Sequence, residues 1–426
     1  MTLQKITTPV FISLVLLAFI FVIFVADARA QTTFGTSEDN KSLGYPDGRK
    51  IVRDSNGNLY AAYRKKSGGY YQIYVSKSSN GGASWTMPSN PISTVAGNFN
   101  QRVPSIAVDS SNTLHVVWYG QDATYSGANE RQIKYSRSFD GGNSWSAWRN
   151  IAPVSGYSGG SYWQEHPVIY VDGGNKIYVV WEGEDSSHSN PQIKFTRSND
   201  GGNFWTNWIN VGETANATNQ SRPTVAVDTN GKIFIIAYGY WQSSGRQNII
   251  YATSASGGSS FSGWNAVSAS GSYEQRHPSA AIDSGNKIHL VWREANGAGK
   301  TEIRYSKFTS PSWSAATTVS ATSGYYQFFP SVANASGSQY VVWTETTEAS
   351  GYPSENPSTG RIVFAKRLQG SSTWAKSNVT GIANDVWGSI RWSSNQLNGG
   401  TIDIVYQSGA TSPFSLKYKS LGIWGQ

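Results

Sequence analysis

Ionisable side chains stand at fixed places in a repeated phrase of this chain, Pro-Ser-x-Ala-Val-Asp followed by a turn and an apolar strand. The proline of this phrase occurs at positions 104, 167, 223, 278 and 330. Glu165 and His166 precede one copy, Arg222 precedes the next, and Arg276 and His277 precede a third. A carboxyl or imidazole group could act here as a general acid or base, and an arginine could bind a carboxylate through paired hydrogen bonds.

Positions that vary between copies are the better candidates for one asymmetric site, because a residue repeated in every copy is expected to do the same structural job. A glutamine stands three residues before the proline at 101, 164, 220, 275 and 327, and we assign it to backbone hydrogen bonding. The varying charged residues are Arg102, Glu165, Arg222, Arg276, Arg293 and Glu294, together with Glu182 after a later strand. The alternative is that they are ordinary ion-paired surface residues.

Aromatic residues lie in the segments beside these positions. Trp163 precedes one copy of the phrase, and Trp241 follows the apolar strand of another. Exposed aromatic rings can stack on the apolar faces of sugars, so together with the arginines they favour an acidic glycan as ligand. The alternative is that these rings only pack against the protein.

A second repeated phrase, Ser-x-Asp-x-Gly-x-x-Trp, indicates which elements carry these residues. It is cleanest at 138–145 and 198–205, and the segment 78–85 keeps its frame with Asn80 in the aspartate position. The aspartate can accept hydrogen bonds from N–H groups of the turn, the glycine can take a positive φ, and the tryptophan can anchor the hairpin. Each clean copy follows a strand-like run such as 132–136, so the phrase predicts a turn at the end of a strand.

The prolines recur every 52 to 63 residues, which predicts repeated units of about four short strands. Apolar runs such as 177–181 and 288–292, bounded by Gly, Asn and Ser, favour strands over helices. Such units repeated radially predict an all-β fold, a β-propeller of four-stranded blades, with seven blades expected and six as the alternative. The last unit lacks one strand, which residues 32–36 could supply to close the ring.

The N-terminal segment is typical of a secretory signal. Lys5, an apolar run over 10–25 and Ala28-Arg29-Ala30 predict cleavage before Gln31, with an uncleaved anchor as the alternative. Residues 31–426 are then expected to form one domain that is secreted or held at the cell surface. No later apolar run is long enough to span a membrane.

Composition excludes several functions. The sequence contains no cysteine, which excludes disulfides and thiolate chemistry. The formal net charge is +8, but only 14% of residues are charged, which is too sparse for a nucleic-acid surface and still favourable for an acidic ligand. No histidine or carboxylate spacing predicts a metal site, and no cofactor motif is present.

The turns at 138–145 and 198–205 are similar to Asp-boxes. With the propeller period, they make residues 31–426 resemble the sialidase superfamily of Asp-box, or BNR-repeat, propellers. In that family the Asp-box is a structural turn on the face away from the active site. The resemblance implies three arginines that bind the sialate carboxylate, a tyrosine nucleophile assisted by a glutamate, and an aspartate as acid and base.

By order along the chain, the resemblance suggests the following residues for these roles: Arg49, Arg222 and Arg276 as the three arginines, Tyr406 as nucleophile, Glu165 or Glu213 as its helper, and Asp47 or Asp122 as the acid. The chain departs from the family in its first unit, where Gly48-Arg49-Lys50-Ile51 replaces an Arg-Ile-Pro phrase. No Asp or Glu occurs between Asp54 and Asp109, where the family acid would lie. The family also has six blades.

Three kinds of function fit these observations. The leading hypothesis is a sialidase-like glycoside hydrolase that recognises and cleaves acidic glycans. A lyase that acts on uronates is the second enzymatic hypothesis, with His166 or His277 as base beside an arginine that neutralises the sugar carboxylate. The alternatives without catalysis are a carbohydrate-binding lectin or adhesin and a protein-interaction scaffold.

Overall fold

The computed structural model describes residues 30–45, 47–94, 98–127, 129–151, 153–154, 162–213, 217–242, 245–268, 273–348, 357–381, 384–393 and 400–422. The proposed signal segment lies outside these residues, apart from Ala30. The described residues form strands, turns and loops without an α-helix. They accordingly include no apolar helix of membrane-spanning length.

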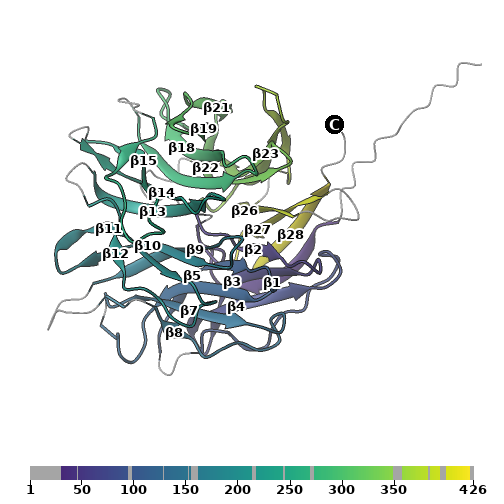
Figure 1. The fold of residues 1–426 in the computed structure, drawn as a ribbon. Coiled ribbons are helices and arrows are strands. Elements are labelled where there is room, and N and C mark those ends of the chain that lie inside the picture. The colour runs from purple at the N-terminus through teal and green to yellow at the C-terminus, as the bar shows by residue number, and fades with distance from the viewer. Residues whose placement is uncertain are drawn as a thin grey trace, which may run out of the picture.

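The strands form seven separate antiparallel sheets that are arranged in a ring (Figure 1). The all-β propeller predicted from the sequence is therefore confirmed, and its blade count is seven. The inner strands of neighbouring blades contact one another around the axis. Short strands that return at once on themselves follow from the Gly, Asn and Ser turns between apolar runs.

Blades one to four follow chain order from the inner to the outer strand. Their strands are β2 (Ile51–Arg53), β3 (Leu59–Ser67) and β4 (Tyr70–Ser78) in blade one; β5 (Gln101–Val108), β6 (Leu114–Gly120), β7 (Gln132–Ser138) and β8 (Arg149–Asn150) in blade two; β9 (Gln164–Val171), β10 (Ile177–Asp185), β11 (His188–Ser198) and β12 (Ile209–Asn210) in blade three; and β13 (Ala217–Val227), β14 (Ile233–Trp241), β15 (Gln247–Ser254) and β16 (Asn265–Ala266) in blade four. In blade one a single bridge between Lys77 and Thr86 stands in the place of the fourth strand.

Blades five to seven complete the ring. Their strands are β17 (Gln275–Ile282), β18 (Ile288–Ala295), β19 (Thr301–Thr309), β20 (Ser312–Trp313) and β21 (Thr317–Ser320) in blade five; β22 (Tyr326–Ala335), β23 (Ser338–Thr346), β24 (Arg361–Arg367) and β25 (Ala375–Asn378) in blade six; and β26 (Asp385–Ser393), β27 (Thr401–Ser408), β28 (Phe414–Gly422) and β1 (Thr32–Ser37) in blade seven.

The two ends of the propeller domain meet in blade seven. Strand β1 pairs antiparallel with β28, from Thr32 opposite Tyr418 to Ser37 opposite Phe414 (Figure 1). The chain thus supplies the outer strand of its last blade from its beginning, and no sheet is left one strand short at this junction.

The repeated glutamines make the backbone hydrogen bonds expected of them. Gln101 donates to the carbonyl of Gln121, and Gln164 donates to that of Glu184. The other three accept from a backbone N–H in the preceding blade, as Gln220 does from Ile193 at 3.0 Å. The two kinds of bond hold each inner strand to its own blade or to the blade before it.

Six of the seven inner strands bend at the residue before the repeated proline, or before Gly388, which takes the place of the proline in β26. Residues at this place have a positive φ, between 48° and 61°: Val103, His166, Arg222, His277, Phe329 and Trp387. The strand register shifts here, for example between Arg102 and Ser105 against β6. A positive φ is unusual for residues other than glycine, and its recurrence at equivalent positions shows that this β-bulge is a regular part of the fold.

Candidate functional site

Tyr45 lies at the centre of one face of the ring, where residues from five blades converge on its side chain. The guanidinium carbon of Arg222 lies 3.5 Å from the centroid of its ring. Four other rings have centroids 5.3 to 5.7 Å away, and they belong to His166, His277, Phe329 and Trp387. The bulged residues of blades three to seven therefore form a single surface around one tyrosine.

The segment that carries Tyr45 is held across this face by bonds to the first and last blades. Asp39 pairs with Arg64 of β3, and the backbone N–H of Arg64 donates to the carbonyl of Ser42 at 2.9 Å. The backbone N–H of Ser42 donates to Oε1 of Gln407 in β27 at 3.0 Å. Tyr45 is a functional candidate that sequence reasoning missed, because it lies outside the repeated units.

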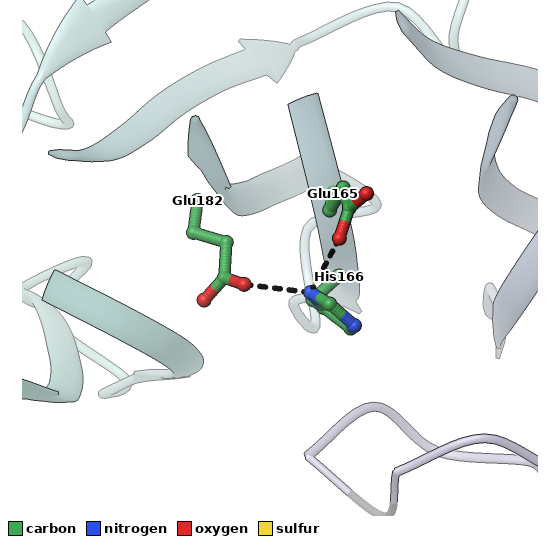
Figure 2. A group of neighbouring side chains, drawn as sticks. All are labelled: Glu165, His166 and Glu182. Carbon is green, nitrogen blue, oxygen red and sulfur yellow. Dashed lines mark hydrogen bonds and ion pairs between the residues drawn. The ribbon is translucent and has the colours of Figure 1, made fainter. Parts of the chain in front are cut away.

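His166 is held by two carboxylates, as Figure 2 shows. Glu165 precedes it in β9, and Glu182 lies in β10 directly opposite Glu165. Nδ1 of His166 is 2.7 Å from Oε1 of Glu182 and 3.7 Å from Oε2 of Glu165. Aligning the repeated units on their proline therefore correctly predicted that Glu165, His166 and Glu182 lie on the same face of the ring.

Glu182 is ionised and acts as a hydrogen-bond acceptor. Its side chain is buried, and its second oxygen accepts the backbone N–H of Arg222 at 2.6 Å. Burial alone would raise the pKa of Glu182, but His166 and Arg222 lower it to about 2. Because an ionised carboxylate can only accept, Nδ1 of His166 is the donor in this hydrogen bond, and Nε2 is the ring nitrogen that Glu182 does not occupy.

A neutral phenol stands beside this imidazole. The ring centroid of Tyr119, in β6, lies 5.4 Å from that of His166. Burial, and then the negative charge of Glu165, raise the pKa of Tyr119 above its ordinary value. Tyr119 therefore keeps its proton at neutral pH.

Two arginines flank the His166 and Tyr119 pair. Among the described residues neither Arg222 nor Arg102 forms an ion pair, and Nε and Nη1 of Arg222 have no hydrogen-bond partner. Burial alone would lower the pKa of Arg222, but Tyr45 and Glu182 raise it above its ordinary value. Arg102 lies opposite Tyr119 in the register of β5 and β6. The site thus combines a base, a proton donor and cationic groups suited to an anionic ligand.

Glu165, His166 and Glu182 could also supply ligands to a metal ion, since one donor atom of each lies within 4.8 Å of the others. However, Arg131 pairs with Glu165 at 2.5 Å, and both oxygens of Glu182 already accept hydrogen bonds. The positive charges of Arg131, beside Glu165, and of Arg222, beside Glu182, would repel a divalent ion. The contacts therefore support a hydrogen-bonded cluster rather than a metal centre.

The structure does not bring Tyr406 or Asp122 into this cluster. Tyr406 is 0% exposed and packs in the core between blades six and seven. Asp122 pairs with Lys134 and accepts from Asn150 at 2.8 Å, so it is held by the outer strands of its blade. The same arrangement recurs in blade three with Asp185, Lys194 and Asn210, which indicates a structural role.

In the part of the chain that the structure describes, none of the remaining predicted residues forms a hydrogen bond or an ion pair with His166. Arg49 lines a cavity of about 240 Å³ in the axial channel, together with Tyr170 and Asn334 of the inner strands. Asp47 is buried, with Oδ1 3.7 Å from Nδ1 of His277. Arg276 pairs with Glu274, and Nη2 of the arginine lies 3.4 Å from Oε2 of the glutamate.

The two predicted tryptophans are half-buried rather than fully exposed. Trp241 packs against the core between blades three and four, which agrees with the packing alternative. Trp163 is half-buried at the start of blade three, and its side chain bonds Glu184. Arg293 is buried, and it lines a separate pocket that is formed by blades four to six on the face that carries Tyr45.

No protein-family model matches the chain, and no curated protein matches it in sequence. Solved structures share its fold. A polysaccharide lyase described as an ulvan lyase, bound to an oligosaccharide of glucuronate and sulfated rhamnose, aligns with a TM-score of 0.63 and 11% identity, over 92% of this chain and 96% of that one.

Two further structures are similar in the same way. Another polysaccharide lyase has a TM-score of 0.56 and 11% identity, over 90% of this chain and 91% of that one. The α-L-arabinofuranosidase of Fusarium graminearum with arabinobiose has a TM-score of 0.51 and 12% identity, over 92% and 98%. The chain therefore shares the propeller fold of glycan-acting enzymes, and its membership of the sialidase superfamily stays a prediction.

Proposed function

We propose that the protein is a glycan-acting enzyme of the lyase type, which cleaves an acidic polysaccharide by β-elimination at a uronate. The observation that carries this proposal is the 2.7 Å bond between Nδ1 of His166 and Glu182. This bond leaves Nε2 as the free base and holds the imidazole in one orientation. The nearby phenol of Tyr119 supplies the complementary acid.

Elimination requires three events, and each has a residue in this site. The cationic side chains of Arg222 and Arg102 bind the uronate carboxylate, which makes the proton on the adjacent carbon, C5, more acidic. Nε2 of His166 removes that proton, and the electron pair forms the C4–C5 double bond as the bond from C4 to the glycosidic oxygen breaks. Tyr119 donates its proton to the departing oxygen. The products are an unsaturated uronate and a new chain end, without water as a reactant.

Hydrolysis fits these residues less well. A glycosidase needs one carboxyl that is protonated near neutral pH, whereas the pKa of Glu182 is held at about 2. The sialidase-type roles suggested by the family resemblance need an accessible tyrosine nucleophile, whereas Tyr406 is 0% exposed. Arg49 lies in the axial channel rather than beside Arg222.

The comparison with known structures supports an acidic glycan as substrate, because one protein with this fold is an ulvan lyase bound to a glucuronate-containing oligosaccharide. The residues before Gln31 support export of the protein as a further part of the proposal. N-terminal sequencing of protein recovered from the culture medium would test that part.

The proposed reaction is tested by incubating purified residues 31–426 with ulvan and with polygalacturonate, and following the ultraviolet absorbance of the unsaturated product. We expect absorbance to rise with one of these polymers, and His166→Gln to slow the rise by about 100-fold or more. His188→Gln is the matched control, because His188 lies away from this site and pairs with Asp185. New reducing ends without absorbance would indicate hydrolysis, and an unchanged rate in His166→Gln would remove His166 as the base.

A further inference from the structure

A second pocket opens on the face that carries Tyr45. Its volume is about 330 Å³, within the range of small-ligand sites. Its walls come from the start of β15, β17 and β22 and from the hairpin between β18 and β19, so it lies across blades four to six. None of its lining residues belongs to the group around His166, which lies in blade three.

The hairpin between β18 and β19 fixes a lysine in this pocket. The turn is closed by bonds between Asn296 and Lys300, and Gly299 takes a φ of +70° that a residue with a side chain would rarely adopt. Nζ of Lys300 lies 3.9 Å from the ring centroid of Tyr326. This cation–π contact holds the ammonium group in place over an aromatic wall.

The pocket is cationic. Lys300, Arg246 and Arg293 line it, and Glu274 is the carboxylate among its lining residues. Glu274 is matched by Arg276, 3.4 Å away at the rim. Among the described residues no carboxylate lies within ion-pair distance of Lys300. Lys300 is therefore a cation of this pocket that can offer its charge to a ligand.

The pocket also presents an aromatic surface. Tyr273 is 38% exposed and stands at its edge, against the hairpin tip at Gly297. An exposed tyrosine beside a fixed cation suits a sugar ring with an anionic substituent, because the ring covers the aromatic face while the substituent meets the cation. An uncharged sugar would leave the ammonium group without an anionic partner.

We propose that this pocket is a second subsite, which binds an oxyanion substituent on a sugar of the polysaccharide some residues away from the bond that is cleaved. The substituent is a carboxylate or a sulfate ester, which share the chemistry that Lys300 recognises. The identity of the polymer rests on the proposed function above, whereas the anion-binding property of the pocket does not. A subsite here makes the enzyme prefer long polyanionic chains over short ones.

The test compares Lys300→Met with Lys287→Met, which removes a lysine from a turn on the opposite face. Both changes are made in full-length His166→Gln protein, so that the ligand is not consumed. Calorimetric titration with oligosaccharides of ulvan and of polygalacturonate gives the dissociation constants. We expect Lys300→Met to weaken binding by about 10-fold and Lys287→Met to leave it within about twofold.

The outcomes separate the two proposals. Weakening with ulvan oligosaccharides alone assigns the pocket to sulfate, and weakening with both assigns it to carboxylate. Unchanged binding by a Lys300→Met protein that melts at the parental temperature would overturn the subsite, even if the enzyme cleaves uronates. Weakened binding in a protein that cleaves neither polymer would uphold the subsite and refute the lyase reaction.

Discussion

Replacing Glu182 with glutamine tests the electrostatics of the cluster without a known substrate. Glutamine keeps the shape of the side chain but cannot ionise. In the folded protein the pKa of Glu182 is held at about 2, against an ordinary value of 4.5. That difference corresponds to about 3 kcal/mol of favourable interaction between the carboxylate and its neighbours.

The direction of the effect on stability follows from this lowered pKa. As the pH falls, the unfolded chain binds a proton at Glu182 before the folded protein does. The stabilisation is therefore complete above about 4.5 and is lost as the pH falls toward about 2. In Glu182→Gln the group does not titrate, so the difference in the free energy of unfolding between the two proteins should change by about 3 kcal/mol across that window.

Urea unfolding followed by tryptophan fluorescence, at a series of pH values from neutral to about 2, measures this difference. Glu165→Gln is the control, because Glu165 is near the same nitrogen but is partly exposed and pairs with Arg131. That control separates the loss of the Glu182 carboxylate from the loss of any carboxylate near Nδ1 of His166. Parallel curves for the parent and Glu182→Gln would refute the reasoning that His166 and Arg222 hold the carboxylate ionised.

Two further predictions concern parts of the fold away from the cluster. Lys50 donates to the carbonyl of Pro104 at 2.6 Å. Burial lowers the pKa of Lys50 to about 7, although the charge of Asp47 acts in the opposite direction. Between about pH 7 and 10.5 the unfolded chain therefore holds a proton that the folded protein has lost, so the parent protein should become more stable as the pH rises through that range. Lys50→Met should abolish that rise in thermal melting curves, and an unchanged rise would contradict the assignment. Asp140 accepts bonds from Ser138 and Ser144 in its turn, so Asp140→Ala should lower the melting temperature by about 1–3 °C and leave catalysis intact. A loss of activity at constant melting temperature would instead give this turn a functional role.

Local patterns in the sequence were sufficient to predict the fold. Strand length, turn residues and the recurrence of the proline depend on contacts within one blade, and every blade repeats them. The residues before the proline were also correctly grouped, because a radial repeat brings equivalent positions to the same face. This is why Glu165, His166 and Arg222 could be selected before the structure was known.

The partners within the site were decided by the tertiary structure. Tyr45 belongs to no repeat, and its position depends on bonds such as that of Ser42 to Gln407, which joins the two ends of the chain. The burial of Tyr406 and the pairing of Asp122 with Lys134 likewise depend on packing between neighbouring strands and blades. A sequence repeat specifies equivalent positions, but the pairing of unlike side chains around an axis depends on distances that exist only after the ring has closed.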